Sequence, residues 1–204
     1  MAPVVFIDSG TCLLNVEQAM QRVSAQRREQ VMRLRRVEDR QAALAAWLLL
    51  QRALQQCYGI AEMGQWKFGA GGKPFLASCP HIHFNLSHTA GVAVCAVDEA
   101  PVGVDVERVV PLDPDVLACT MNCDEQTSIT ASGHPEETFM HLWTRKEALL
   151  KLTGHGLTDD LPAALTGAHG VALHTFSPVQ GVICSLASHH PIIAPEIIHI
   201  YTRM

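Results

Sequence analysis

Three apolar runs between residues 82 and 107, separated by short links, constrain the fold more than any other part of the chain. Residues 82–87 alternate between apolar and polar side chains, which is typical of a half-buried β-strand. Residues 92–97 and 102–107 are rich in valine and are joined by the four-residue turn Asp98-Glu99-Ala100-Pro101. This spacing predicts that the second and third runs form an antiparallel hairpin.

Two long helical patterns flank these strands. Between about residues 24 and 58, large apolar side chains recur at steps of three and four residues, and Gly59 is well placed to end the helix. The arginine-rich start of this pattern is either a separate helix or an ordered turn. A second helix begins at Pro135, where two glutamates in the first turn complement the helix dipole, and it ends near Gly154.

The remaining segments are shorter. Residues 4–8 are expected to form a first strand, and residues 69–74 a glycine-rich loop. Residues 111–135 are only weakly periodic. Three apolar runs near the end of the chain are typical of antiparallel strands: 171–176, 181–187 and 192–201. This order of elements predicts an α+β fold of two similar halves, residues 1–104 and 105–204.

Composition and length limit the class of protein. A chain of 204 residues, 48% of them hydrophobic, can fill a real core. It has no apolar run of the roughly 18 residues that a membrane span needs, and its first residues do not resemble a signal peptide. The seven cysteines are scattered and include no Cys-x-x-Cys, which favours reduced thiols. We therefore expect a cytoplasmic monomer without a membrane or nucleic-acid partner.

The charge is unevenly distributed. The formal net charge is −5, yet eight of the fifteen Lys and Arg residues lie between Arg22 and Arg52, where only three acids occur. A basic segment beside an acidic remainder indicates a phosphate-rich ligand or an acidic partner. A solvated helix face is the alternative.

Two carboxylates lie on one side of the third strand. Side chains alternate along a strand, so Asp105 and Glu107 share the face opposite three valines. Carboxylates this close raise each other's pKa unless a positive charge lies between them, and hard oxygen ligands suit magnesium. The alternative is a strand whose acids simply face water.

A third acid lies on the second helix. Glu147 and Lys151 are four residues apart and share a helical face. Taken alone, they could form an ordinary surface ion pair.

Candidate phosphate-binding groups lie at the end of the first of the three strands and in the glycine-rich loop. Ser87 and His88 can donate hydrogen bonds to phosphate oxygens from a strand end. Lys73 could also meet a phosphate, although a lone loop lysine usually only adds solubility.

A zinc site is an alternative for the cysteines and histidines. Alternation on a strand would place His81 and His83 on one face, near Cys79, and Cys119 lies four residues before Cys123. A surface histidine pair beside a strand is the commoner arrangement.

The order and spacing of these motifs are more specific than any one of them. Gly-Lys-Pro, Asn-Leu-Ser-His, Pro-Val-Gly-Val-Asp-Val-Glu and Trp-Thr-Arg-Lys-Glu-Ala-Leu-Leu-Lys-Leu-Thr-Gly-His-Gly-Leu follow one another. This series resembles the 4′-phosphopantetheinyl transferases of the surfactin-synthetase type. The resemblance covers residues 71–157 well and extends weakly back to Arg40. Residues 115–133 depart from it, because they lack the aromatic-rich segment often found there, although Glu125 matches an acid in that segment.

The resemblance implies a site and a fold. The residues that it places at a magnesium ion, which manganese could replace, are Asp105, Glu107 and Glu147. Those that it places at coenzyme A are Arg40, Lys73, Ser87, His88 and Lys151. The implied fold is a pseudo-twofold pair of halves, each a helix packed on a small antiparallel sheet, with coenzyme A in the cleft between them.

The implied reaction transfers 4′-phosphopantetheine from coenzyme A to a serine of an acyl or peptidyl carrier protein, releasing 3′,5′-ADP. Glu147 is the expected base, directly or through a metal-bound water, and His88 and Lys151 are expected to offset negative charge on the phosphates. The rival hypothesis is a non-catalytic module that binds coenzyme A or a carrier protein.

Overall fold

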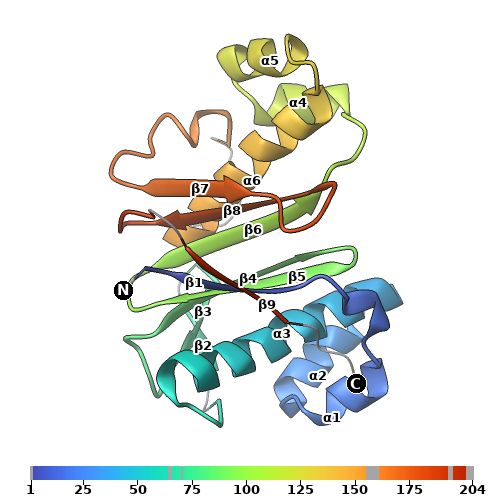
Figure 1. Cartoon of the computed structure of the whole chain (residues 1–204), viewed down its shortest axis with the longest axis vertical. Helices are drawn as coiled ribbons and strands as arrows, with labels where there is room; N and C mark the ends of the chain where they lie inside the picture. Colours follow the sequence, from blue (N-terminus) through green and yellow to red (C-terminus); the bar gives the residue numbers. More distant parts are fainter. Residues whose placement is uncertain (1, 64–65, 70, 155–160, 193–194, 201–204) are drawn as a thin grey trace.

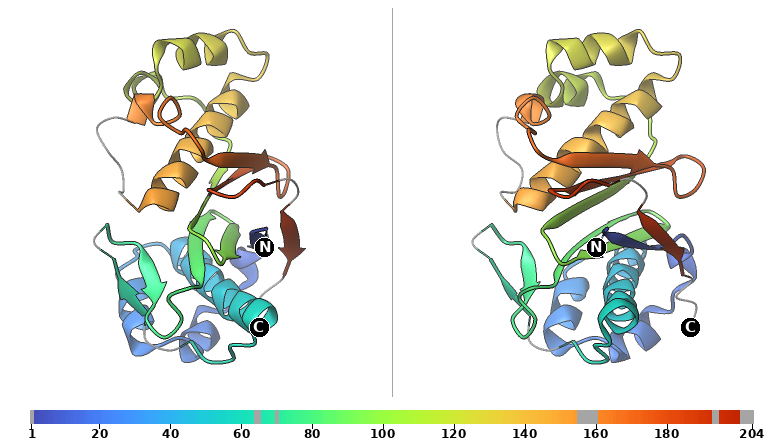
Figure 2. Two further views of the ribbon diagram at one scale, coloured as in Figure 1. Left: turned by 90° about the vertical axis from the view of Figure 1, so that its left-hand side faces the viewer. Right: turned by 60° about the vertical axis from the view of Figure 1, so that its left-hand side comes forward.

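Two β-sheets are stacked face to face between two groups of helices, which gives four layers (Figures 1 and 2). The computed structural model describes the chain except residues 1, 64–65, 70, 155–160, 193–194 and 201–204. Helix α3 (Val37–Tyr58) covers the outer face of the first sheet, and α6 (Pro135–Thr153) covers the outer face of the second.

The first sheet has the strand order β4-β5-β1-β9. Its strands are β1 (Val4–Asp8), β4 (His83–Thr89), β5 (Val92–Asp98) and β9 (Glu196–His199). Three of them are antiparallel neighbours, but β9 runs parallel to β1. The prediction that residues 192–201 form an antiparallel strand is therefore wrong. Ile198 and Ile200 pack against the core of the N-terminal half, so the end of the chain crosses back to the first sheet.

The second sheet is fully antiparallel, in the order β6-β8-β7. Its strands are β6 (Val102–Arg108), β7 (Ala172–Phe176) and β8 (Val182–Ser188). A separate hairpin of β2 (Trp66–Phe68) and β3 (Pro74–Leu76) carries the predicted glycine-rich loop at its turn.

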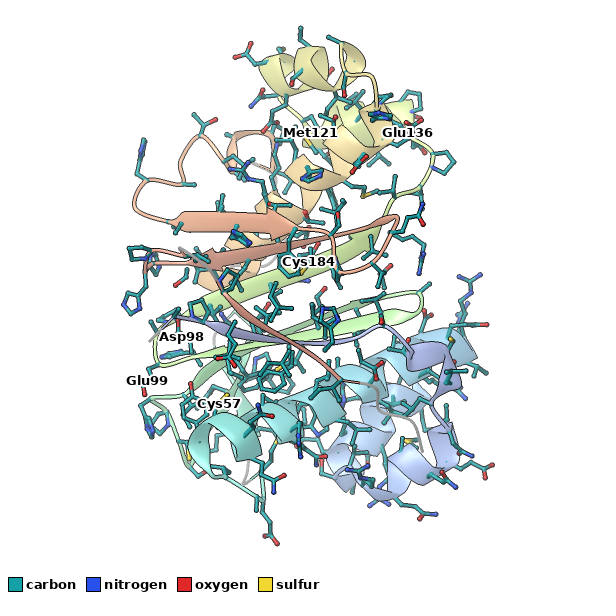
Figure 3. All side chains as sticks on the ribbon, viewed as in Figure 1. Cys57, Asp98, Glu99, Met121, Glu136 and Cys184 are labelled. Carbon is teal, nitrogen blue, oxygen red and sulfur yellow. The ribbon has the colours of Figure 1, made fainter. Side chains whose placement is uncertain are left out.

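The predicted hairpin of residues 92–97 and 102–107 is also wrong, because the two strands belong to different sheets. β5 pairs with β4 and β1, whereas β6 pairs with β8. Valines such as Val104 pack across the inter-sheet core against Val94 and Val5, and Cys184 of β8 lies in the same core (Figure 3). Stacking buries β5 on both faces, and apolar burial of this kind drives the link at residues 98–101 to cross between sheets.

The tight hairpin is the one that joins β4 to β5. Its two-residue loop, Ala90-Gly91, has Gly91 at φ 82°, a conformation that glycine adopts without steric cost. This hairpin places the end of β4, with Ser87 and His88, beside the turn.

Two side chains of β4 join the edges of the two sheets by accepting hydrogen bonds from the backbone of β6. Asn85 Oδ1 on β4 accepts a hydrogen bond from the backbone N–H of Val104 at 2.9 Å. Ser87 Oγ accepts one from the N–H of Val106 at 3.4 Å. These bonds satisfy N–H groups on the edge strand β6, and they hold the Asn-Leu-Ser-His segment against the Asp-x-Glu segment.

The N-terminal helical pattern is interrupted. The 3-10 turn η1 (Thr11–Leu13) and α1 (Val16–Gln21) precede α2 (Ala25–Met32), and residues 33–36 separate α2 from α3. The arginine-rich start is thus a separate helix. Gly59, at φ 69°, ends α3 as predicted.

The weakly periodic segment contains two short helices, α4 (Pro114–Thr120) and α5 (Cys123–Thr130). Asp113 caps the first, with proline at its first position, and Asn122 with Glu125 forms a capping box on the second. Helices of two turns are too short to show a clear 3.6-residue period, so their caps were the better sequence signal.

The mixed α+β class is confirmed. The pseudo-twofold relation and the division at residue 104 stay predictions, since Val104 lies inside β6 and β9 joins the first sheet. Within the described part of the chain, no helix combines the length and apolar character needed to cross a bilayer.

Candidate active site

A lysine, a serine and an aspartate from three elements meet where β4, β6 and α6 converge. Lys151 Nζ donates to Asp105 Oδ1 at 2.6 Å and to Ser87 Oγ at 3.0 Å. Ser87 Oγ in turn donates to Asp105 Oδ1 at 2.9 Å. The structure therefore brings together one residue from each of three predicted motifs.

All three predicted metal ligands line one cavity of about 390 Å³. Asp105 and Glu107 reach it from β6 and Glu147 from α6, beside His88 and Trp143. Burial and the neighbouring Asp105 raise the pKa of Glu107 to about 7, against the opposing effects of a hydrogen bond with Thr89 and of Lys151. Burial and Asp105 also raise the pKa of Glu147. The cavity therefore concentrates negative charge that it does not fully neutralise.

The donor chemistry of this cavity fits a divalent cation. Asp105 Oδ2 and Glu147 Oε1 are buried and have no hydrogen-bond partner among the described residues. Such oxygens carry a large desolvation cost unless a cation or donor meets them, and carboxylates suit magnesium. The side chains are not preassembled as ligands, because no group of three acidic, histidine or cysteine side chains within the described ranges has metal-binding geometry. Lys151 instead contacts Asp105.

His88 lines this cavity and lies within electrostatic reach of Arg27 in α2. Burial lowers the pKa of its imidazole, and the positive charges of Arg27 and Lys151 lower it further. Asp39 and Asp105 act in the opposite direction, and the net effect favours the neutral imidazole, which can donate one hydrogen bond and accept another.

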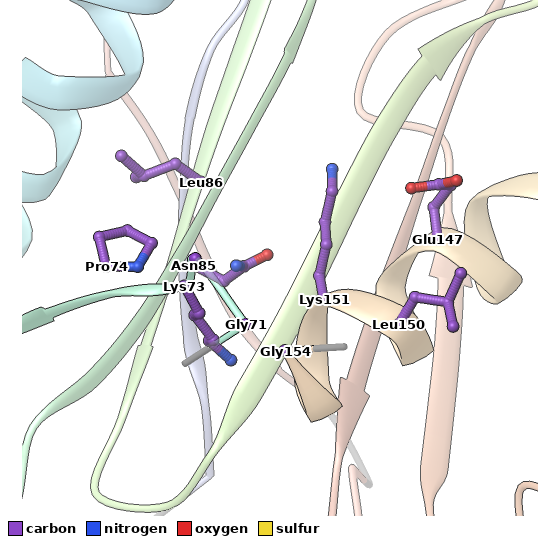
Figure 4. A pocket seen from close by; sticks show the side chains of 10 residues that line it. Gly71, Lys73, Pro74, Asn85, Leu86, Glu147, Leu150, Lys151 and Gly154 are labelled. Atoms are coloured by element: carbon purple, nitrogen blue, oxygen red, sulfur yellow. The ribbon is translucent and has the colours of Figure 1, made fainter. Parts of the chain in front are cut away.

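A second cavity, of about 260 Å³, adjoins the first and shares Leu86, Glu147 and Lys151 with it. Its walls come from the β2–β3 turn, β4 and the C-terminal turns of α6 (Figure 4). A Cβ atom at Gly71 would overlap the carbonyl oxygen of Gly154, so only glycine lets the loop approach the helix end this closely. This contact closes one end of the cavity.

Lys73 lies in the wall of the second cavity, but its ammonium group already has partners. Nζ donates to the carbonyl oxygens of Val102 at 2.8 Å and Leu152 at 3.2 Å. Burial lowers its pKa to about 8. Lys73 therefore joins the start of β6 to the end of α6, at a position from which it could also meet a ligand.

Arg40 is the one predicted site residue that lines neither of the two cavities. Its Nε donates to the carbonyl oxygen of Leu34 at 2.8 Å. Arg27, which the sequence did not single out, influences His88 electrostatically. Its guanidinium lies 5.0 Å from the ring centroid of Trp47, and burial lowers its pKa to about 10.

The structure also adds residues to the site. Asn85 lines the second cavity and Trp143 the first. Both lie inside motifs noted in the sequence, but nothing in the sequence assigned either residue a role. Neither zinc alternative forms a group of three ligands within the described ranges.

Comparison with known proteins agrees with these motifs. A family model described as the N-terminal part of 4′-phosphopantetheinyl transferase matches residues 12–100. The model of the 4′-phosphopantetheinyl transferase superfamily matches residues 101–182.

Curated relatives carry the same name. A 4′-phosphopantetheinyl transferase of Bacillus subtilis is 33% identical over 158 residues, which cover 76% of this chain and 70% of the relative. The transferase Sfp of Bacillus subtilis strain 168 is 30% identical over 157 residues, covering 75% and 70%. The transferase AcpT of Salmonella typhimurium is 31% identical over 135 residues, covering 60% and 67%. The chain therefore belongs to the 4′-phosphopantetheinyl transferase superfamily.

Proposed function

We propose that the two adjoining cavities hold coenzyme A and that Glu147, Lys151 and His88 carry out the transfer of its 4′-phosphopantetheine group. The chain is an enzyme of the 4′-phosphopantetheinyl transferase class, which modifies carrier proteins. One observation carries the assignment. Lys151 is hydrogen-bonded to Ser87 and Asp105, and it lies with Glu147 in the wall that the two cavities share.

The phosphates of coenzyme A need positive charge and hydrogen-bond donors, and this part of the molecule offers both. Lys151, Ser87 and His88 are proposed to bind the diphosphate, and Lys73 to lie near the nucleotide. Arg40 stays a candidate for the 3′-phosphate. Arg27 is a second candidate, because it acts on His88 and its Nε has no partner among the described residues.

The metal is proposed to be magnesium, with manganese as a substitute. Asp105, Glu107 and Glu147 would hold it through their carboxylate oxygens, two of which have no hydrogen-bond partner in the part of the chain that the structure describes. When bound, such an ion neutralises negative charge on the diphosphate. Lys151 contacts Oδ1 of Asp105, so the ammonium group and the metal would share this carboxylate.

The proposed reaction is a displacement at phosphorus. The serine oxygen of the carrier forms a bond to the β-phosphorus of coenzyme A, and the bond from that phosphorus to the 3′,5′-ADP oxygen breaks. Glu147 accepts the serine proton, directly or through a water. Lys151 and His88 stabilise charge on the phosphate oxygens and the leaving group.

The partner is proposed to be an acyl or peptidyl carrier protein, and the enzyme to work as a cytoplasmic monomer. The comparisons do not favour the rival hypothesis of a non-catalytic module, because the named relatives are transferases.

Mass spectrometry of an apo carrier protein tests the proposal. Incubation with the enzyme, coenzyme A and magnesium should add one phosphopantetheine group to the carrier serine. A carrier with that serine replaced by alanine should keep its mass, and the enzyme variant Glu147→Gln should load the intact carrier much more slowly than the wild type. Binding of coenzyme A without product, for every carrier class tried, would support the non-catalytic module instead.

A further inference from the structure

Lys146 is fully buried, next to Glu147 in α6, yet it belongs to neither cavity. Its side chain is 0% exposed, and it is the largest buried cation of the described core. Burying an ammonium group costs several kcal/mol unless hydrogen bonds and an opposite charge offset the loss of water. Its surroundings must therefore be built to receive it.

Three acceptors from three other segments surround this ammonium group. Nζ donates to Glu125 Oε2 in α5 at 2.6 Å and to the carbonyl oxygen of Thr120, at the end of α4, at 2.8 Å. It also donates to the carbonyl oxygen of Pro162 in the 3-10 turn η2 (Leu161–Ala163) at 3.2 Å. A lysine has three donor hydrogens, so all of them are used.

The acceptors are themselves tied together. Glu125 Oε2 also accepts from the backbone N–H of Asn122 at 2.9 Å, and Asn122 Nδ2 donates to the carbonyl oxygen of Pro162 at 3.3 Å. Met121, which lies between α4 and α5, marks this end of the molecule (Figure 3). We call Lys146, Thr120, Asn122, Glu125 and Pro162 the lysine node. It joins α4, α5 and η2 to the helix that carries Glu147.

Glu147 itself has little to hold it. Its Oε1 is buried without a hydrogen-bond partner among the described residues. The direction of its side chain therefore depends on how α6 is placed. Successive helical residues point about 100° apart, so a rotation of α6 that moved Lys146 would turn Glu147 by the same angle.

Residues of α6 on either side of Lys146 contact the second sheet. Thr144 Oγ1 lies 2.8 Å from Ser185 Oγ of β8, and Gly103 of β6 meets the backbone at Ala148. Those contacts hold the helix against the sheet, whereas the lysine node holds the opposite side. Like the pair of Lys151 with Asp105 at the cavity, the node carries charges, so rotation there would leave a buried ammonium and a carboxylate unpaired.

We propose that Lys146 is a positioning residue for Glu147: the lysine node fixes the rotation of α6 and so keeps the Glu147 carboxylate directed toward Asp105. The inference rests on the proposed role of Glu147 as base and metal ligand. Lys146 is buried and lines neither cavity, so its effect on the reaction would pass through Glu147.

Kinetics of Lys146→Met, compared with a second destabilised variant, tests whether loss of the node slows the reaction. Ile129→Ala removes buried apolar contact from α5 and leaves all five residues of the node in place, so it controls for a loss of stability in this region. At a temperature where all variants are folded, Lys146→Met should lower kcat about 10- to 100-fold and leave the KM for coenzyme A within about twofold. Ile129→Ala should keep kcat. Equal losses of kcat in the two variants would overturn the proposal.

Manganese binding gives a readout that does not depend on turnover. Titration of Mn²⁺ followed by electron paramagnetic resonance, with coenzyme A present, should show weaker binding to Lys146→Met than to Ile129→Ala. Lys146→Arg, which keeps the charge, should recover part of the affinity. Unchanged Mn²⁺ affinity in Lys146→Met would count against a displaced Glu147.

A double-mutant cycle with Glu147→Gln separates this inference from the proposed function. If Lys146 acts through Glu147, Lys146→Met should cost less than about twofold in the Glu147→Gln background. The same loss in both backgrounds overturns the positioning role alone, whereas full activity of Glu147→Gln overturns the role of Glu147 and the inference with it. If Lys146→Met does not fold, Glu125→Gln replaces it, because the amide oxygen can keep the bond from Asn122.

Discussion

Nζ of Lys151 lies 2.6 Å from Oδ1 of Asp105, although the two residues are 46 positions apart in the chain. The aspartate side chain is 3% exposed and the lysine side chain 29%. Lys151 therefore forms an ion pair with an acid that is also a proposed metal ligand. The ammonium group and a metal ion would compete for this carboxylate, so removal of one should strengthen binding of the other.

Replacement of Lys151 should move two affinities in opposite directions. Lys151→Ala removes a partner of the coenzyme A phosphates, so coenzyme A binding should weaken about tenfold and transfer should slow. It also frees Asp105, so Mn²⁺ alone should bind more tightly than to the wild type. Isothermal titration with each ligand measures both effects. Unchanged coenzyme A affinity together with an unchanged rate would refute the role of Lys151.

Loss of the Asp105 charge should abolish transfer. Asp105→Asn keeps the shape of the side chain but removes one proposed metal ligand and leaves Lys151 without its ion pair, so we expect at least about a thousandfold lower kcat. Asp98→Asn is the matched control, because Asp98 is also a buried acid on a strand but lines neither cavity. Wild-type loading of carrier protein by Asp105→Asn would show that the metal assignment is wrong.

Lys73 should give stability a specific pH dependence. Its pKa is about 8 in the folded chain and 10.5 as the ordinary value, so the unfolded chain holds the extra proton between these pH values. The free energy of unfolding should therefore rise with pH across this range, by on the order of 1 kcal/mol once solvent screening is allowed for.

Thermal denaturation between pH 7 and 10 measures this effect as the difference between the wild type and Lys73→Met. The wild type should gain roughly 2–4 °C relative to the variant as pH rises. Coenzyme A affinity should fall over the same range, because a neutral amine attracts phosphate less. If the melting temperatures of the two proteins changed with pH in the same way, the lowered pKa of Lys73 would be wrong.

Gly103 should tolerate no side chain. A Cβ atom there would overlap the carbonyl oxygen of Ala148 and crowd the backbone N–H of Leu152 at 2.5 Å, so α6 would have to move away from β6. Gly103→Ala should lower the free energy of unfolding by about 2–4 kcal/mol and reduce transfer by displacing Glu147 and Lys151. Gly133→Ala is the control, since nothing lies within 4 Å of a Cβ atom there. Denaturant titration and carrier loading measure the two effects, and equal behaviour of both variants would contradict the close contact.

Local patterns in the sequence were sufficient for the elements that carry the site. The spacing of Glu147 and Lys151 placed both on one helical face, and the alternation of Asp105 and Glu107 placed both on one side of a strand. Both predictions are confirmed, since all four residues line one cavity. Such patterns are set by helical and strand geometry, which depends only on neighbouring residues.

Pairing of strands could not be predicted in the same way. The link at residues 98–101 is short enough for a hairpin, and nothing local distinguishes a turn within a sheet from a crossing between sheets. In the folded chain the valines of β6 are buried in one core with residues of β5 and β1, and burial of this kind depends on the whole sheet and not on the link. The parallel position of β9 beside β1 depends equally on contacts between opposite ends of the chain.

The sequence by itself thus determined which residues have the chemistry of the site and which of them share a helix or strand face. The tertiary structure decided which faces meet. It brought Lys151 to Asp105, engaged Lys73 with two backbone carbonyls, left Arg40 away from both cavities and buried Lys146 in a node of its own. The physical reason is that side-chain direction is a local property, whereas burial and charge pairing depend on segments that only the folded core brings into contact.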